Sequence, residues 1–328
     1  MDKIVECVPN ISEGRNTKVI NLITNEINKI NEVNLLHIDS NKDANRTVIT
    51  FAGEPKSVYN AAYNLVKKAI ELIDMQKHYG VHPRIGAVDV CPFVPVKGIQ
   101  MEETVEIARK FGKQIANDFN IHVYFYEFAA KLPYRIKLEN CRYGEYENLE
   151  NKLNIPDWKP DYGPLKFNPK TGATAVAARK FLIAYNINLK TKSVEIAKTI
   201  AGEIRESGSK FKNPGLLKHV KAIGWYLKEY DMVQVSTNIT NPDKISIYKV
   251  FNTVKKMAIK YNTTVIGSEI IGLIPLKYII PPGKSDKNTL QKINQSVKIL
   301  NLNHLNKFIP EKKVLELVLE KKFNKNIF

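Results

Sequence analysis

The sequence has few cysteines and no long apolar run, and both absences exclude classes of protein. Its 328 residues include three cysteines, Cys7, Cys91 and Cys141. An odd number at wide spacing argues against a disulfide framework or a zinc ribbon. No stretch of about 18 apolar residues could span a bilayer, and the acidic N-terminal run is no signal peptide. We therefore expect a cytoplasmic protein with no membrane partner.

Common catalytic and nucleic-acid motifs are also missing. The chain has no P-loop, no G-x-G-x-x-G after a predicted strand and no G-x-S-x-G elbow. It has no zinc-finger or RNP signature, and its aromatic residues do not alternate with basic ones as in a stacking platform. Nucleotide binding and serine hydrolysis thus lack their motifs, and we expect no nucleic-acid partner.

Charge is the unusual global property, because 50 Lys and Arg residues against 33 Asp and Glu residues give a net charge of +17. A solvated lysine-rich surface, a nucleic-acid footprint or attraction of an acidic substrate would each explain it. The first is the commonest meaning of a lysine excess. Part of the excess lies in residues 284–328, where apolar residues beside charged ones predict an amphipathic helix rather than a basic arm.

Hydrophobic periodicity predicts the same order of elements twice, and the length favours two domains. In residues 1–178 we expect strands at 3–9, 33–39, 46–52, 88–96 and 121–125 and helices at 15–31, 54–74 and 101–117. In residues 179–283 we expect strands at 181–188, 221–226, 232–237 and 264–270 and helices at 193–206 and 243–261. The repeated β-α-β-β-α-β order predicts an α/β (α+β) protein with two ferredoxin-like split βαβ subdomains. Residues 284–328 would form a Lys-rich helical extension.

Residues 154–178 are rich in proline, glycine and aromatic residues. A linker is one interpretation of this composition. A long ordered loop that lines a cleft is the other, and the composition does not decide between them.

The segment 78–97 is the best candidate for a site, because it combines titratable groups with prolines and glycines that restrict the backbone. His78 and His82 have the spacing of a helical metal pair, but Gly80 and Pro83 disfavour that helix and no H-E-x-x-H motif occurs. We therefore expect no metal. His82 could transfer protons near neutral pH, or it could merely fix the loop by hydrogen bonds.

Other polar groups near predicted strand ends leave similar choices. Arg84 could hold a carboxylate in a bidentate fork, or pair with Asp89 or Asp74. Asp39, which shares a strand face with His37, and Asn10 could each belong to a site or to an ordinary turn. Cys91 could be a nucleophile beside a histidine, but its apolar strand favours a buried structural thiol.

These residues lie in runs that resemble the glutamate formiminotransferase family, the formiminotransferase domain of folate-linked histidine degradation. The runs are CVPNISEG at 7–14, Asp39 with RTV at 46–48, GVHPRIGAVD at 80–89, and GP at 163–164 through GAT at 172–174 to ARKFLIAYNIN at 178–188. They cover most of residues 1–280 in order.

The resemblance implies two α/β subdomains with a folate-binding cleft between them, in a homodimer. It implies transfer of a formimino group from N-formimino-L-glutamate to tetrahydrofolate as co-substrate, giving 5-formiminotetrahydrofolate and L-glutamate. His82 matches the catalytic histidine. The folate loop matches Gly163, Pro164, Leu165, Lys166, Phe167, Asn168, Pro169, Lys170, Thr171 and Gly172. Vertebrate relatives continue into a cyclodeaminase domain, so here a separate cyclodeaminase is expected to process the product.

Chemical reasoning assigns further roles within this family. One imidazole, His82, could take the proton from the attacking nitrogen and return it to the leaving amine. Asp39 could orient it, Arg84 or Arg179 could hold a substrate carboxylate, and Asn10 is a further binding candidate. The positive charge would attract anionic formiminoglutamate and polyglutamylated folate. Formyl transfer between 5-formyltetrahydrofolate and glutamate on the same scaffold, or a basic nucleic-acid-binding protein, are the alternatives.

Overall fold

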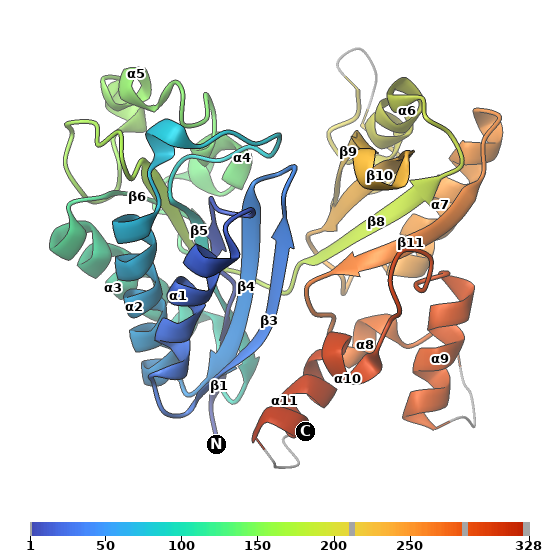
Figure 1. Cartoon of the computed structure of the whole chain (residues 1–328), viewed down its shortest axis with the longest axis horizontal. Helices are drawn as coiled ribbons and strands as arrows, with labels where there is room; N and C mark the ends of the chain where they lie inside the picture. Colours follow the sequence, from blue (N-terminus) through green and yellow to red (C-terminus); the bar gives the residue numbers. More distant parts are fainter. Residues whose placement is uncertain (1, 210–213, 284–287, 324–328) are drawn as a thin grey trace. The chain divides into compact units, whose positions relative to one another are not determined.

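The computed structural model describes residues 2–209, 214–283 and 288–323. It divides the chain into two compact units, Met1–Arg179 and Lys180–Phe328, and Figure 1 shows the elements of each. The boundary differs by one residue from the one expected between 178 and 179. No helix in the described part of the chain is long and apolar enough to cross a membrane.

The first unit contains the expected split βαβ arrangement. Its strands are β1 (Ile4–Cys7), β2 (Asn10–Ile11), β3 (Val33–Asn41), β4 (Arg46–Gly53), β5 (Val88–Lys97), β6 (His122–Glu127) and β7 (Ala173–Ala178). The antiparallel order β3-β4-β1-β5 is that of a ferredoxin-like sheet. The short β2 follows β1 and also pairs with β4 and β5.

Strands β7 and β6 extend this sheet in parallel beyond β5. β7 is not among the predicted strands, because its sequence ATAVAA has little β-branched character and no alternation. All six of its residues are buried, as is typical of a parallel strand that is covered on both faces. Part of residues 154–178 is therefore a central strand, and the preceding loop runs directly into it.

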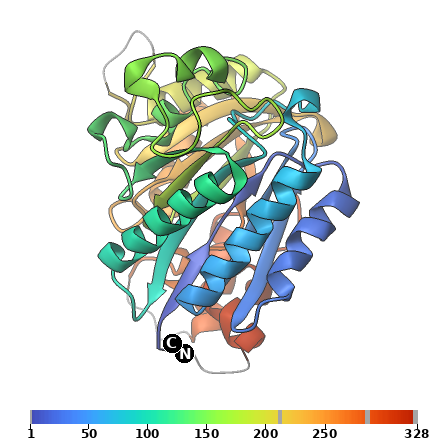
Figure 2. The ribbon, with the colours of Figure 1, turned by 90° about the vertical axis from the view of Figure 1, so that its left-hand side faces the viewer.

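Helices α1 (Thr17–Asn28), α2 (Pro55–Leu72) and α3 (Met101–Phe119) cover one face of the sheet, as Figure 2 shows. The Asn16 and Glu54 side chains cap α1 and α2, and Pro55 occupies the first turn of α2. The opposite face of β5, β7 and β6 carries a smaller core that includes Leu149 and Leu153. These two residues belong to α5 (Leu149–Leu153), which follows α4 (Leu138–Cys141).

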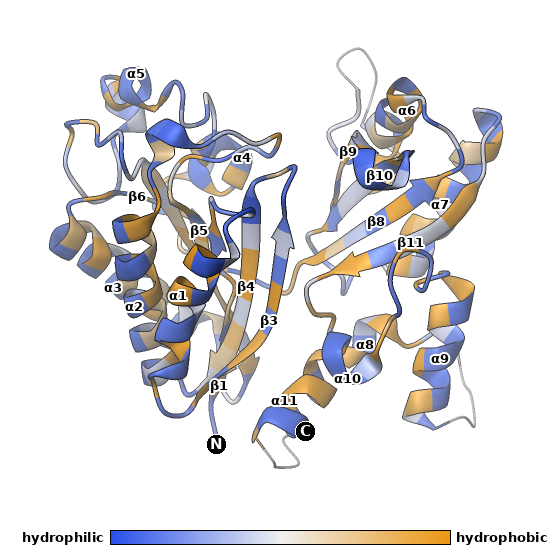
Figure 3. Cartoon of the chain, in the orientation of Figure 1, coloured by the Kyte–Doolittle hydropathy of each residue, from blue (hydrophilic) through white to orange (hydrophobic). Residues whose placement is uncertain are grey.

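The second unit repeats the same topology in a four-stranded sheet. Its elements are β8 (Ile183–Leu189), α6 (Val194–Ile204), β9 (Val220–Leu227), β10 (Met232–Ile239), α7 (Ile247–Lys260) and β11 (Val265–Ile271). The antiparallel order β11-β8-β10-β9 again matches a ferredoxin-like sheet. Along β8, core residues such as Tyr185 and Ile187 alternate with Asn186 and Asn188, an alternation that is visible in Figure 3.

The described part of residues 284–328 belongs to this second core. It forms α9 (Thr289–Ile299), α10 (Pro310–Lys313) and α11 (Leu315–Phe323), after α8 (Leu276–Ile279). Ile293, Val297 and Leu300 have helical spacing, and all three are buried against the second unit. The expected separate extension is corrected accordingly, because its apolar stripe completes a core. Residues 284–287 and 324–328 of that extension lie outside the described residues.

Candidate active site

The site loop spans residues 73–87 and connects α2 to β5. It lies on the turn between β3 and β4, where Val81 N–H donates to the Asp43 carbonyl at 3.2 Å and His78 Nε2 donates to the Asn45 carbonyl at 2.8 Å. Gly80 is required at this contact, since a Cβ there would lie 2.2 Å from the Ala44 carbonyl oxygen. The hairpin turn thus fixes the loop that carries His82.

Hydrogen bonds define the tautomer of the His82 ring. Its Nδ1 lies 2.7 Å from the Pro83 carbonyl, which can only accept, so Nδ1 carries the proton. Its Nε2 therefore has the lone pair, and it accepts from Arg46 Nη1 at 2.7 Å. Burial, followed by the charges of Arg46 and Arg142, lowers the pKa of His82 to about 2. The imidazole is neutral at physiological pH.

Arg46 is a site residue to which the sequence assigned no role. Burial, followed by the charge of Arg142, lowers its pKa to about 10, while Asp89 and Asp39 oppose the shift. Its Nε is buried and has no hydrogen-bond partner among the described residues. The signal in the sequence is the RTV run at 46–48, which is among the runs that resemble the family.

Asp39 lies on β3 in register with Val48 of β4. The His82 ring accepts a hydrogen bond from Arg46 and donates one to the Pro83 carbonyl. The charge of Asp39 raises the pKa of Arg46, the residue that donates to the His82 ring. Its expected orienting role stays a prediction.

Asp89, one of the expected partners of Arg84, is paired with Arg142 instead. Arg142 Nε donates to Asp89 Oδ1 at 3.2 Å, and Nη2 forms an ion pair with Oδ2. The Asp89 Oδ1 atom also accepts from Ile85 N at 3.1 Å. This buried pair fixes the end of the site loop to the segment after α4.

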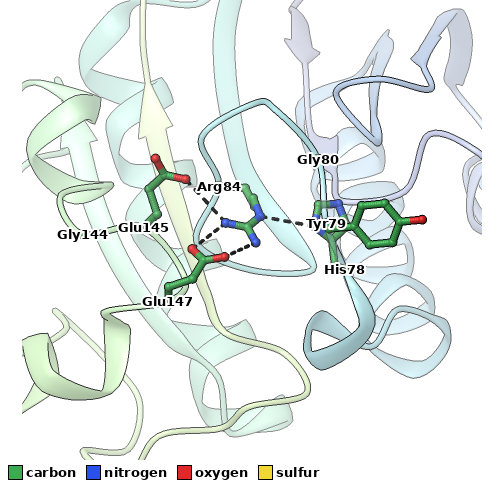
Figure 4. Close-up of a pocket in the computed structure, with 7 residues that line it drawn as sticks. All are labelled: His78, Tyr79, Gly80, Arg84, Gly144, Glu145 and Glu147. Carbon is green, nitrogen blue, oxygen red and sulfur yellow. Dashed lines mark hydrogen bonds and ion pairs between the residues drawn. The ribbon is translucent and has the colours of Figure 1, made fainter.

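Arg84 contacts two other carboxylates, beside a pocket of about 510 Å³. Its Nη1 donates to Glu147 Oε2 at 2.7 Å, its Nη2 donates to Oε1, and Glu145 lies at 3.5 Å. Its Nε donates to His78 Nδ1 at 3.2 Å. Figure 4 shows Arg84 between these glutamates and His78. Of its expected partners, Asp74 instead caps the short helix Met75–Lys77.

The two segments expected to form the site lie side by side in the first unit. Ala87 N–H donates to the Thr171 carbonyl at 2.8 Å, and Ala173 N–H donates to the Ile85 carbonyl at 2.8 Å. Gly172 has φ of 63°, and a Cβ on it would lie 2.2 Å from the Ile85 carbonyl oxygen. The end of the 163–172 loop is thus fixed against the end of the His82 loop.

The 163–172 loop is held mainly through its backbone. Asn168 accepts from Gly172 N through its carbonyl and from Lys170 N through Oδ1. His122 is buried and lies within hydrogen-bonding distance of the Lys166 and Gly172 carbonyls. Residues with exposed side chains or backbone are Gly163, Leu165, Lys166, Pro169 and Lys170, while Pro164 and Phe167 are half-buried. His122 is thus a structural residue of the loop that sequence analysis missed.

Three further candidates lie in the sheet. Asn10 is 4% exposed, and its Oδ1 has no hydrogen-bond partner among the described residues. Arg179 follows β7, and its backbone N–H donates to Phe93. Cys91 is fully buried 3.6 Å from the Cys7 sulfur, which favours the structural thiol over a nucleophile. No group of three or more His, Cys, Asp or Glu side chains in the described ranges could hold a metal.

Comparison with known proteins identifies the family. The N-terminal subdomain of the formiminotransferase domain matches residues 4–179, and the formiminotransferase domain matches residues 184–320. The glutamate formimidoyltransferases of Streptococcus pyogenes and Thermoplasma acidophilum are 46% and 41% identical to this chain, over 85% and 86% of it and 92% and 91% of their own length. The formimidoyltransferase-cyclodeaminase of Dictyostelium discoideum is 44% identical over 98% of this chain, which spans 61% of that longer protein. The chain therefore belongs to the formiminotransferase family.

Proposed function

We propose that this chain transfers the formimino group of N-formimino-L-glutamate to tetrahydrofolate and releases L-glutamate. Two observations together carry the proposal. The chain covers 92% of a protein named glutamate formimidoyltransferase at 46% identity, and the His82 imidazole in its site loop is neutral with a fixed tautomer. In this function the product is 5-formiminotetrahydrofolate, and tetrahydrofolate is consumed as a co-substrate.

In the proposed mechanism His82 moves one proton. Nitrogen 5 of tetrahydrofolate attacks the formimino carbon, and the proton on that nitrogen passes to His82 Nε2, the ring atom with the lone pair. The adduct then collapses, the bond to the glutamate nitrogen breaks, and Nε2 returns its proton to the departing amine. The other proton stays on Nδ1 throughout and remains hydrogen-bonded to the Pro83 carbonyl, so the ring keeps its orientation.

Arg46 must release Nε2 before this proton transfer. A pKa of about 2 makes the free His82 ring a weak base, because the ring is buried beside cationic side chains. Bound carboxylates of either substrate would offset that positive charge and raise the pKa towards the range useful at neutral pH. An Arg46 side chain that turns from Nε2 to a bound anion would do the same. Binding and activation of the base are thereby coupled.

The remaining site assignments belong to the same proposal. The segment Gly163, Pro164, Leu165, Lys166, Phe167, Asn168, Pro169, Lys170, Thr171 and Gly172 would contact folate, with Asn10 as a further binding residue. Arg84 and Arg179 would hold carboxylates, and Asp39 would support His82 through Arg46. A homodimer in the cytoplasm, and a cyclodeaminase that takes the product, complete the proposal.

The decisive test is an assay of the purified chain with tetrahydrofolate and either N-formimino-L-glutamate or N-formyl-L-glutamate. Formation of 5-formiminotetrahydrofolate from the first donor supports the proposal. Faster transfer from the formyl donor would favour the formyl reaction on the same scaffold. A salt-dependent affinity for DNA or RNA without any transfer would instead support a nucleic-acid-binding protein.

A further inference from the structure

The ion pair between Arg84 and Glu147 joins a buried cation to an exposed anion. The Arg84 side chain is 7% exposed, whereas the Glu147 side chain is 62% exposed. Both Nη atoms of Arg84 donate to the two carboxylate oxygens of Glu147. A buried guanidinium needs an anionic partner because water cannot solvate it. An exposed carboxylate has no such need, so the arginine depends on this pair far more than the glutamate does.

Contacts other than Glu147 also hold the Arg84 side chain in place. Its Nε donates to His78 Nδ1 at 3.2 Å, and His78 is itself fixed by its hydrogen bond to Asn45. The Tyr146 ring lies 5.8 Å from the guanidinium carbon, within the range of a cation–π interaction. The guanidinium fork would therefore keep its direction if Glu147 moved away.

Space for a ligand lies beside this fork. The pocket of about 510 Å³ is within the usual range of small-molecule sites. Its lining residues are His78, Tyr79, Gly80, Arg84, Gly144, Glu145 and Glu147. Figure 4 shows the Glu147 carboxylate directed at Arg84 from the segment between α4 and α5. Glu147 is thus the exposed carboxylate that a ligand carboxylate would replace at Arg84.

We propose that this pocket binds the carboxylate of a glutamyl group, and that Glu147 competes with that carboxylate for Arg84. The exchange leaves one carboxylate in the fork, so the charge around Arg84 stays the same while Glu147 turns to water. Hydrogen bonding to Arg84 lowers the pKa of Glu147, which keeps the competing group ionised. The inference rests on the proposed function, since N-formimino-L-glutamate and the tail of tetrahydrofolate both supply glutamyl carboxylates.

The test is binding of glutarate, a five-carbon dicarboxylate, to the full chain by calorimetry. Glu147→Gln removes the competing charge, and we expect it to bind glutarate about threefold or more tightly than the wild type. Glu150→Gln is the matched control, because Glu150 is an exposed glutamate three residues further along the chain. It makes the same change in net charge and should leave the affinity unchanged.

A purely structural ion pair predicts the opposite sign. Loss of Glu147 would then leave Arg84 badly placed, so glutarate would bind equally or more weakly, and that result would overturn the inference. Binding by no variant would overturn it too. If Glu147→Gln does not fold, Glu147→Asp serves instead, because its shorter side chain weakens the fork while it keeps the charge. We expect the same direction with a smaller change.

Steady-state kinetics distinguish the two sources of the carboxylate. A lower KM for N-formimino-L-glutamate alone in Glu147→Gln assigns the pocket to the donor, and a lower KM for tetrahydrofolate alone assigns it to the acceptor. Tighter glutarate binding in a chain without transfer activity would uphold the pocket and refute the proposed function. Normal transfer with an unchanged or higher KM for both substrates would refute the role of Glu147 only.

Discussion

The two units share one strand order, but they differ in the connection before the last strand of that order. In the first unit, residues 73–87 join α2 to β5 and carry His78, His82 and Arg84. In the second unit, residues 261–264 join α7 to β11 at the equivalent place. The shared topology provides a rigid sheet, and the longer connection provides the candidate chemistry. In such a fold the function depends on the loops that connect the strands and helices, and not on the sheet itself.

The largest expected effect comes from removing the imidazole of His82. Only the first unit carries histidine in this connection. His82→Ala should lower turnover by about a hundredfold or more, the usual size of a general acid–base contribution. The rate of formimino transfer under saturating substrates measures it. Cys91→Ser is the matched control in the adjoining strand and should stay active. A fully active His82→Ala, or a folded but inactive Cys91→Ser, would contradict the assignment.

The second unit depends instead on its C-terminal helix. Ile293 of α9 is fully buried in that unit's core, so Ile293→Ala should reduce the free energy of unfolding by about 3 kcal/mol. Denaturant titration, monitored by circular dichroism, provides the measurement. Exposed Leu290 on the same helix gives the control, and Leu290→Ala should change stability little. Equal effects of the two variants would mean that α9 is a separate extension after all.

Gly172 in the first unit and Gly272 in the second unit both have a left-handed backbone, but they differ in how closely other atoms pack against them. Gly172 has φ of 63° and an added Cβ on it would lie 2.2 Å from a backbone oxygen, whereas Gly272 has φ of 73° and no atom within 4 Å of an added Cβ. Gly272→Ala should destabilise the protein by about 1 kcal/mol from backbone strain alone. Gly172→Ala should destabilise it by roughly 2 kcal/mol more, because it adds a steric clash with the site loop. Equal unfolding free energies of the two variants would show that Gly172 is not packed tightly against the site loop.

The smallest expected effect is a pH dependence that arises in the first unit. Burial lowers the pKa of His82 to about 2, against about 6.5 in the unfolded chain. Between these values the unfolded state binds the proton and the folded state does not, so stability falls as the pH drops below 6.5. From pH 7.5 to 5.5 this group should reduce the unfolding free energy by about 1 kcal/mol.

Denaturant titrations at the two pH values, with His82→Gln as the comparison, test this dependence. The variant should lose less stability than the wild type on acidification, because its side chain does not titrate. The His82 ring signal in the NMR spectrum should also show no titration between pH 5 and 8. A midpoint near 6.5 would show that the ring is solvated and that Arg46 does not contact it.

Much of the fold followed from local patterns. Apolar periodicity located the helices at 17–28, 55–72 and 101–119 to within a few residues, because each has one strongly buried face and a capping residue or proline at its start. Strand β7 was not predicted, because small residues in a strand buried on both faces give no period-two signal. The cleft expected between the two units stays a prediction.

For the site, the sequence identified a constrained loop and a resemblance to one family. Together these favoured His82 as the catalytic candidate. The sequence excluded a helical histidine pair, since Gly80 and Pro83 act locally on the backbone. The local sequence did not show which carboxylate pairs with Arg84, because Glu147 lies 63 residues away along the chain. The same holds for Arg46, whose contact with His82 spans 36 residues.

The sequence by itself determined the repeated βαββαβ order, the family and the identity of the catalytic candidate. The order depends on hydrophobic periodicity, whereas the family and the choice of His82 depend on runs that resemble the family, such as GVHPRIGAVD at 80–89. All of these are properties of short segments. Only the tertiary structure decided the tautomer and low pKa of His82, its contact with Arg46 and the ion pair between Arg84 and Glu147. Those properties come from burial and from charges that distant segments place within a few ångströms of one another.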